Sequence, residues 1–95
     1  MRNVVVHGRV QGVGFRAWTE MTALERGLGG WVRNRRDGSV EGFFVGAPDA
    51  VAAMITACAE GPPGSRIDRI DQRAGTREEL ALRRRGELFS VLGTL

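Results

Sequence analysis

One stretch decides the fold of this chain: Arg9-Val10-Gln11-Gly12-Val13-Gly14-Phe15-Arg16. Three valines, typical of a strand, precede this stretch, and apolar residues follow it at helical spacing. Gly12 and Gly14 can adopt positive φ, and they leave room for an approaching group because they lack a Cβ. The pattern therefore predicts a tight turn between a strand and a helix, with open backbone at the start of the helix.

Such a turn has the features of an anion site. Its consecutive N–H groups can converge, and the following helix adds free N–H groups and the positive end of its dipole. Arg16 adds a planar fork of donors that fits two phosphate oxygens. One alternative stays open, which is that the glycines only turn the chain. Gly12–Ala17 also fits the looser G-x-G-x-x-A dinucleotide fingerprint. A chain of 95 residues is too short for the doubly wound sheet that this fingerprint requires.

Length, cysteine content and charge narrow the classes of protein. The 95 residues predict a single domain spanning 1–95. The single cysteine, Cys58, excludes an internal disulfide and favours a reducing compartment. We expect a cytoplasmic protein without a membrane partner, because no signal peptide and no apolar run of about 18 residues is present. The net charge of +3, supplied by arginine without lysine, favours an anionic partner, either nucleic acid or a small phosphorylated molecule.

The first elements follow from periodicity. Residues 3–10 alternate as a strand whose buried face carries Val4, Val6, Gly8 and Val10. Residues 15–26 form a helix, and we expect its inward stripe to be Ala17, Met21 and Leu24. After this helix, Gly27 reads as a left-handed cap and Leu28 as the residue that folds back on the last turn.

The rest of the chain supplies a hairpin, a second helix and two more strands. Asp37-Gly38 predicts the turn between strands over 31–35 and 40–45. Pro48 begins a helix with an apolar face formed by Val51, Met54, Ile55 and Cys58. Residues 66–73 form a weakly patterned strand, and residues 88–92 form a short last strand. Between them, residues 75–86 with three consecutive arginines read as a solvated loop.

This order, β-α-β-β-α-β with a short C-terminal strand, predicts an α+β fold. It packs as a ferredoxin-like two-layer sandwich, with an antiparallel sheet and two helices on one face. The same order hosts RNA-binding modules, which stack bases on aromatic side chains of the open sheet face. Phe43 is the one candidate on its strand and the chain has no tyrosine, so we do not expect a nucleic acid partner.

Two blocks of this sequence stand out together. The first is Gly8–Arg16; the second is Gly30-Trp31-Val32-Arg33-Asn34, followed by Asp37-Gly38-Ser39-Val40. In wording and mutual spacing these blocks resemble the acylphosphatase family. The loop Gly61-Pro62-Pro63-Gly64 is also similar to the family pattern. The resemblance covers Val4 to about Ile70, while the segment 74–87 is longer and more charged than the family's usual link, which leaves the register of the last strand open.

The resemblance implies a small cytoplasmic hydrolase that splits acyl phosphates into a carboxylate and inorganic phosphate, without a metal or any other cofactor. It implies that Arg16 binds the substrate phosphate and that Asn34 holds the attacking water. It also implies that the phosphate is cradled by the backbone of Val10, Gln11, Gly12, Val13, Gly14 and Phe15. The expected partners are then a small-molecule acyl phosphate and, as product inhibitor, inorganic phosphate. The expected state is a monomer.

The residues alone leave several alternatives. Asn34 precedes a hairpin turn and could simply shape it. A related domain occurs in larger hydrogenase-maturation proteins that transfer carbamoyl groups, although a chain of this length argues against that context. A sensor that binds phosphate without turnover is a further alternative. We expect Trp31 in the core, His7 on the surface, and three arginines on a solvated face that attracts anions: Arg33, Arg35 and Arg36.

Overall fold

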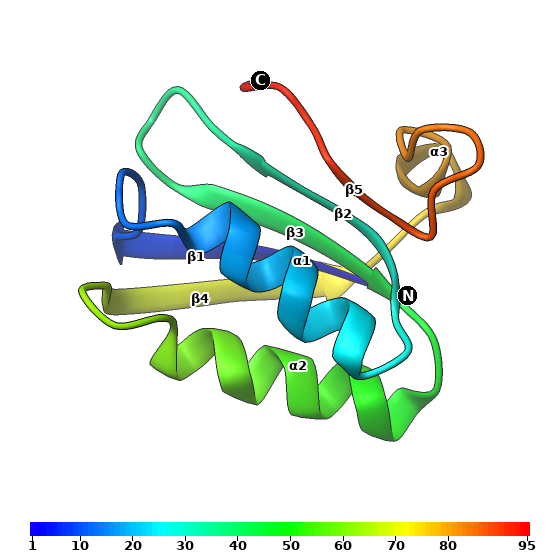
Figure 1. The fold of residues 1–95 in the computed structure, drawn as a ribbon, viewed down its shortest axis with the longest axis horizontal. Helices are drawn as coiled ribbons and strands as arrows, with labels where there is room; N and C mark the ends of the chain where they lie inside the picture. Colours follow the sequence, from blue (N-terminus) through cyan, green and yellow to red (C-terminus); the bar gives the residue numbers. More distant parts are fainter.

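A computed structural model describes all residues, 1–95, and contains five strands and three helices (Figure 1). The elements in chain order are β1 (Arg2–Arg9), α1 (Phe15–Glu25), β2 (Gly29–Asn34), β3 (Val40–Val45), α2 (Pro48–Glu60), β4 (Arg66–Ala74), α3 (Arg77–Leu80) and β5 (Phe89–Val91). The strands form one sheet in the order β4-β1-β3-β2-β5. This confirms the predicted ferredoxin-like arrangement, including the weakly patterned strand over residues 66–73.

The sheet is mixed rather than wholly antiparallel as expected. The β1–β3, β1–β4 and β2–β3 pairs are antiparallel, whereas β5 runs parallel to β2. The register gives the reason. Ala74, where β4 ends, is opposite Arg2, and Arg2 is opposite Phe44, which in turn pairs with Gly30 at the start of β2. The chain thus returns to β2 at the end where β2 begins, and β5 then runs beside it in the same direction.

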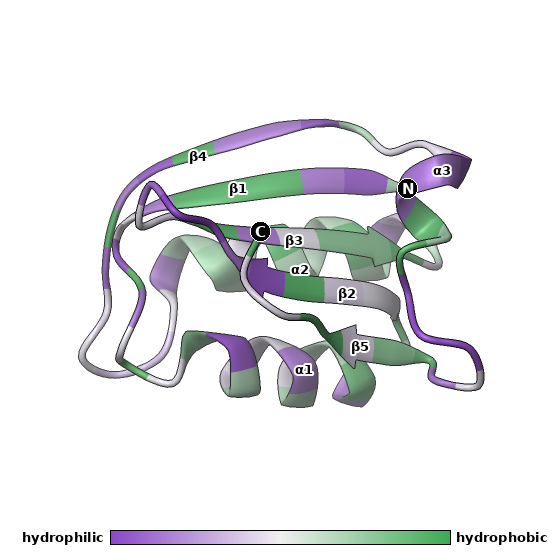
Figure 2. Ribbon diagram, turned by 90° about the horizontal axis from the view of Figure 1, so that it is seen from above, coloured by the Kyte–Doolittle hydropathy of each residue, from purple (hydrophilic) through white to green (hydrophobic).

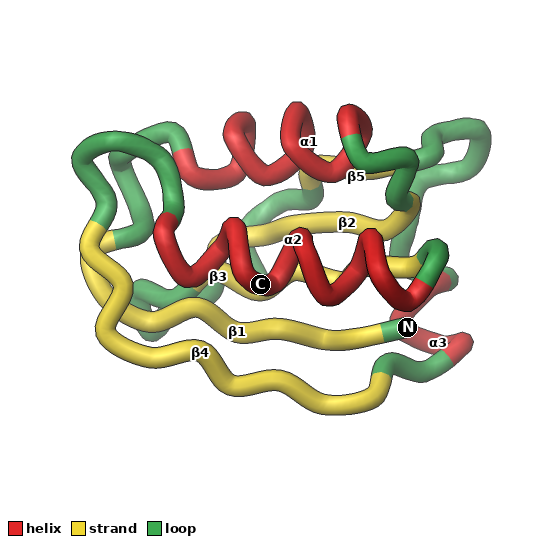
Figure 3. The backbone as a smooth tube through the Cα atoms, turned by 90° about the horizontal axis from the view of Figure 1, so that it is seen from below, coloured by secondary structure: helices red, strands yellow, loops and turns green.

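Helices α1 and α2 lie side by side over one face of this sheet (Figures 1 and 3). Between the two layers lies the core, which includes Val4, Val6 and Val10, as the alternation predicted. The predicted inner face of α2 is confirmed, with Met54 and Cys58 fully buried. Burial raises the pKa of the Cys58 thiol to about 12, so this cysteine is an inert core residue.

The predicted inner stripe of α1 was wrong. Ala17, Met21 and Leu24 are exposed, and the side chains turned inward are those of Phe15, Thr19, Thr22 and Ala23. The cost of burying a hydroxyl is removed at Thr19, whose Oγ1 donates to the Phe15 carbonyl at 2.8 Å. Phe15 is 2% exposed and sets the rotation of the helix, because the tight turn carries it directly into the core. The left-handed cap at Gly27 and the burial of Leu28 are confirmed.

The second face of the sheet is partly covered by a segment predicted to be a solvated loop. Within this segment, Thr76 and Glu79 form a capping box at the start of α3, and the Trp31 indole donates to the Glu79 carbonyl at 2.7 Å. Trp31 and Phe43 stack beneath the segment with ring centroids 5.7 Å apart, and both are fully buried. Of this segment, the residues that follow α3 form a loop at the end of the sheet, which is hydrophilic in its middle (Figure 2). Phe43 is therefore closed off from base stacking.

Arg33 also differs from the expectation of a solvated arginine. Its side chain is 16% exposed, its Nε donates to the Glu41 carboxylate at 2.8 Å, and its guanidinium lies 4.7 Å from the Trp31 ring. Asn3 donates to the same carboxylate at 2.8 Å and to the Glu79 carboxylate at 2.9 Å. Every buried side-chain polar atom has a partner. This network fixes β2 and β3 to each other just before the residue that the resemblance implies is catalytic.

Candidate active site

The turn between β1 and α1 has the backbone conformation that its sequence predicts. Gly12 has φ +76° and Gly14 has φ +78°, both in the left-handed region. A Cβ placed on either glycine would have no atom within 4 Å, so the conformation and not crowding requires glycine here. Both glycines lie along the wall of an open pocket.

The backbone of this turn presents unused donors. None of the seven N–H groups from Gln11 to Ala17 donates to an acceptor within the chain; the first bond of the helix runs from Trp18 N to the Gly14 carbonyl. Gly14 occupies the N-cap position without a side-chain cap, and the first turn of α1 carries no acidic residue. The positive end of the helix dipole and these donors are therefore available to an anion.

The pocket beside these donors has a volume of about 340 Å³ and brings the two sequence blocks together. Its polar lining includes Arg16 from the start of α1 and Asn34 from the end of β2. Both side chains are half-buried, and neither makes a hydrogen bond or an ion pair within the chain. Two side chains that fold into one pocket without partners are able to bind a ligand there.

The remaining predicted residues play different parts. Val10, Gln11, Gly12, Gly14 and Phe15 line the pocket, with the Val10 and Phe15 side chains anchored in the core. Val13 does not line the pocket, because its side chain packs against the core. The sequence reading missed Ala17, Glu20 and Val91, which complete the wall. Glu20 follows Arg16 by one helical turn, a spacing that could have indicated it; nothing local could have indicated Val91.

The hairpin that follows Asn34 fixes the position of this residue. It pairs with Val40, and the turn beyond it closes through Arg35 N, which donates to the Ser39 carbonyl at 2.9 Å. Hydrogen bonds from the Ser39 hydroxyl and N–H hold the Asp37 carboxylate and lower its pKa. The Gln11 amide reaches this turn from the loop and donates to the carbonyls of Arg35 and Ser39, at 2.8 and 2.9 Å. This contact joins the two blocks and was not predicted from the sequence.

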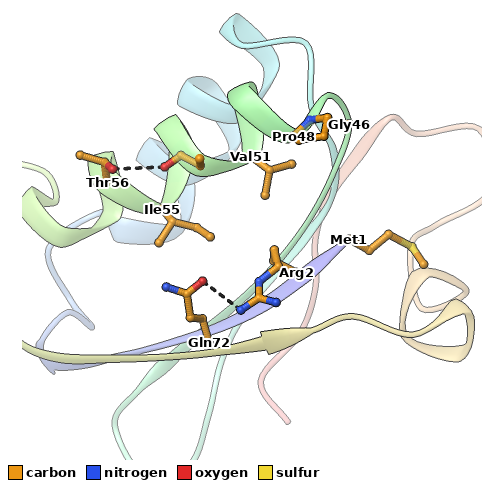
Figure 4. A pocket seen from close by; sticks show the side chains of 9 residues that line it. Met1, Arg2, Gly46, Pro48, Val51, Ile55, Thr56 and Gln72 are labelled. Carbon is orange, nitrogen blue, oxygen red and sulfur yellow. Dashed lines mark hydrogen bonds between the residues drawn. The ribbon is translucent and has the colours of Figure 1, made fainter.

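The other candidate features of the molecule lie away from this pocket. A second cavity of about 400 Å³ opens between α2 and the edge formed by β1 and β4 (Figure 4). Its principal cation, Arg2, donates to Gln72 at 3.1 Å, so the cavity has a paired guanidinium and apolar walls from Val51 and Ile55. His7 lies on the partly exposed strand surface, as expected, beside Asp71 at 3.1 Å.

Two general findings concern metals and membranes. No group of three or more histidine, cysteine, aspartate or glutamate side chains is arranged to hold a metal ion. None of the helices has the length and apolar character needed to cross a bilayer.

Comparison with known proteins gives a consistent result. A family model described as acylphosphatase matches residues 2–83. An acylphosphatase of Bradyrhizobium diazoefficiens is 58% identical over 92 residues, which cover 97% of this chain and 93% of that protein. The crystal structure of acylphosphatase from Bacillus subtilis superposes with a TM-score of 0.80 at 34% identity, covering 96% of both chains. A full-length HypF structure, in a phosphate- and nucleotide-bound form, matches at 30% identity and a TM-score of 0.79, over 98% of this chain but 12% of its own.

Proposed function

This chain belongs to the acylphosphatase family, and we propose that it hydrolyses its substrate by direct attack of water on phosphorus in the pocket at the start of α1. The enzyme is a hydrolase of acyl phosphates, acting on the bond between a carboxyl group and phosphate. The observation that carries the proposed mechanism is the convergence of the unpaired Arg16 and Asn34 side chains on a wall of unused backbone N–H groups.

The phosphate group binds in the loop between β1 and α1. Its oxygens accept from N–H groups of the stretch from Val10 to Phe15, and Arg16 donates two parallel hydrogen bonds from its guanidinium. The transferred phosphoryl group carries its charge mainly on three equatorial oxygens, so fixed donors around it stabilise the transition state. Because the loop already holds its positive-φ conformation, the donors need no reorganisation when the substrate arrives.

The leaving group explains why so few side chains suffice. An acyl phosphate is a mixed anhydride, and its leaving group is a carboxylate whose conjugate acid has a pKa of about 4. Such a group departs without being protonated, so the reaction needs no general acid. Positioning and charge stabilisation can then supply most of the rate enhancement, and positioning alone can be worth about 7 to 11 kcal/mol.

Asn34 orients the attacking water. Its amide has both a donor and an acceptor, so it can hold a water molecule in a defined direction, but it is too weakly basic to remove a proton. We assign the role of proton acceptor to a phosphate oxygen of the substrate itself. In this scheme the water oxygen forms a bond to phosphorus while one water proton passes to a phosphate oxygen, and the P–O bond to the carboxylate breaks. Inorganic phosphate and a carboxylate are released.

The scheme has consequences for partners and location. Inorganic phosphate resembles the phosphoryl part of the substrate, so it should occupy the same loop and inhibit as a product. We propose that residues 1–95 act as one domain and as a monomer, since a single copy supplies every residue to which the scheme assigns a role. A buried, inert Cys58 and the absence of any disulfide suit the cytoplasm. Nucleic acid and membranes play no part in this proposal.

The test is hydrolysis of benzoyl phosphate by the wild-type protein and by Asn34→Ala. Truncation should lower kcat about 100- to 1,000-fold, the range for loss of one preorganised group. The inhibition constant of inorganic phosphate should stay unchanged, because Asn34 contacts the water and not the phosphate. If kcat is unchanged, Asn34 only shapes the hairpin turn and does not hold the water. A wild-type protein that binds phosphate but does not turn over would instead be a sensor.

A further inference from the structure

We propose that the Gln11 side chain is a positioning residue, which ties the phosphate-binding loop to the β2–β3 hairpin and thereby sets the place of Asn34. This inference rests on the proposed function, because it assigns Gln11 an effect on turnover that passes through Asn34. From the sequence, only the backbone of Gln11 was expected to contact the phosphate. The structure adds a specific task for its amide, which reaches two carbonyls that lie 24 and 28 residues further along the chain.

The amide bridges a gap in the sheet. The β1–β3 ladder ends at the Val6–Val40 pair, so no ladder bond joins β1 to β3 beyond that point. The loop that follows β1 therefore lies beside the hairpin turn (Figure 1) without backbone bonds to it. Gln11 Nε2 closes this gap with bonds of 2.8 Å to the Arg35 carbonyl and 2.9 Å to the Ser39 carbonyl. Arg35 directly follows Asn34, so the bridge acts one peptide unit from the proposed water-holding residue.

The hairpin does not need this bridge in order to fold. The Arg35 carbonyl already accepts from Gly38 N at 3.1 Å, and the Ser39 carbonyl accepts from Arg35 N at 2.9 Å. A carbonyl oxygen has two lone pairs, and Gln11 occupies the second one on each. Removing the amide therefore leaves no orphaned backbone acceptor. What is lost is the defined separation between the loop and the hairpin.

The geometry also separates this role from phosphate binding. A primary amide has two donor hydrogens, and both are committed to the hairpin. The oxygen that remains is an acceptor and cannot donate to a phosphate anion. The Gln11 side chain therefore affects the reaction through the hairpin and not through direct contact with the phosphate.

The experiment compares Gln11→Met, Asn34→Ala and the double variant, using benzoyl phosphate as substrate and inorganic phosphate as inhibitor. Methionine keeps the length of the side chain and removes both donors without adding charge. Gln72→Met is the matched control, because it makes the same substitution at a glutamine whose side chain is also hydrogen-bonded. Gln72 accepts from Arg2 and lies outside the pocket that contains Arg16 and Asn34. Thermal denaturation of each variant shows that it is folded.

We expect Gln11→Met to lower kcat about 10- to 100-fold, as a displacement of about 1 Å at a reacting group does. Its inhibition constant for phosphate should stay within about twofold of wild type, a range well below one kcal/mol. The double variant should have the kcat of Asn34→Ala alone, because Gln11 acts through Asn34 and the two losses do not add. Gln72→Met should match wild type.

Three results would overturn the inference. If Gln11→Met keeps its kcat, the bridge is only structural. A parallel loss of phosphate affinity would mean that the amide supports the phosphate-binding loop instead. A further kcat loss in the double variant, added in full to that of Asn34→Ala, would mean that Gln11 acts independently of Asn34. Failure of the proposed function looks different, because Asn34→Ala itself would then retain turnover.

Discussion

Replacing Gly14 by valine should weaken phosphate binding far more than it weakens the fold. Gly14 has φ +78° at the N-cap of α1, a conformation that a β-branched residue strongly disfavours. A Cβ there would meet nothing within 4 Å, so the cost is conformational and amounts to at least about 1 to 2 kcal/mol of unfolding free energy. For a domain of this size that lowers Tm by about 4 to 8 °C per kcal/mol.

The chain offers a matched control for that cost. Gly86 lies in the loop before β5, with φ +83° and likewise no atom within 4 Å of an added Cβ. Gly86→Val should therefore lose a similar amount of unfolding free energy. It lies outside the pocket, so its phosphate site should be intact. The difference between the two variants isolates what the loop conformation does for the anion.

The assay is the Tm shift produced by inorganic phosphate in each variant. At phosphate concentrations of about 100 Kd, binding should stabilise wild type and Gly86→Val by about 2.7 kcal/mol. A tenfold loss of affinity in Gly14→Val would remove about 1.3 kcal/mol of that stabilisation. If Gly14→Val keeps the full phosphate-induced shift, the glycine only turns the chain, and the reasoning about a backbone cradle is refuted.

Three further predictions concern charge and metal. Arg16→Lys should lose turnover by about 100-fold or more, because lysine keeps the charge but not the planar fork; steady-state kinetics that stay near wild type would make Arg16 a general attractor. Activity should be the same with and without EDTA, and loss that a divalent ion restores would contradict the metal-free mechanism. Glu79→Gln should lower the unfolding free energy by about 1 kcal/mol or less at pH 7, since the Arg73 side chain is 56% exposed and solvent screens the pair. Hydrogen bonding from Arg73 lowers the pKa of Glu79 below its ordinary 4.5, so its contribution is present above that pH and disappears as the pH falls through the lowered value. Denaturation curves of the two proteins should accordingly converge in acid, and a constant gap would exclude this carboxylate as the cause.

Local sequence features were enough to predict much of the fold and the two segments that form the pocket. Glycines with positive φ, a Pro at the start of α2, and the Asp37-Gly38 turn each carry their structural reason within a few residues. They place the β1–α1 loop and the β2–β3 hairpin, and the sheet order then brings Arg16 and Asn34 to one pocket.

The errors arose where distant residues decide the outcome. The apolar stripe of α1 suggested that Met21 and Leu24 face inward, but the anchoring of Phe15 in the core rotates the helix so that two threonines are buried instead. The charged segment after β4 reads as solvated by composition. Its capping box and the Trp31 indole, 48 residues away from Glu79, nevertheless dock it on the sheet.

The contacts that complete the site are of the same kind. Val91 reaches the pocket wall only because β5 adds to β2 in parallel. The Gln11 bridge joins residues 24 and 28 positions apart. Neither contact leaves a periodic or spacing signal in the sequence, since each depends on which strands become neighbours.

The most direct test of the mechanism is hydrolysis of benzoyl phosphate in water enriched in ¹⁸O. The products formed early in the reaction are separated, and their masses are measured by mass spectrometry. If water attacks phosphorus, the label enters inorganic phosphate, and the benzoate keeps its original oxygens. A control without enzyme and a control that incubates unlabelled phosphate with enzyme account for background and exchange. Label in the benzoate would mean attack on the carbonyl carbon, and it would contradict the roles proposed here for the loop and for Asn34.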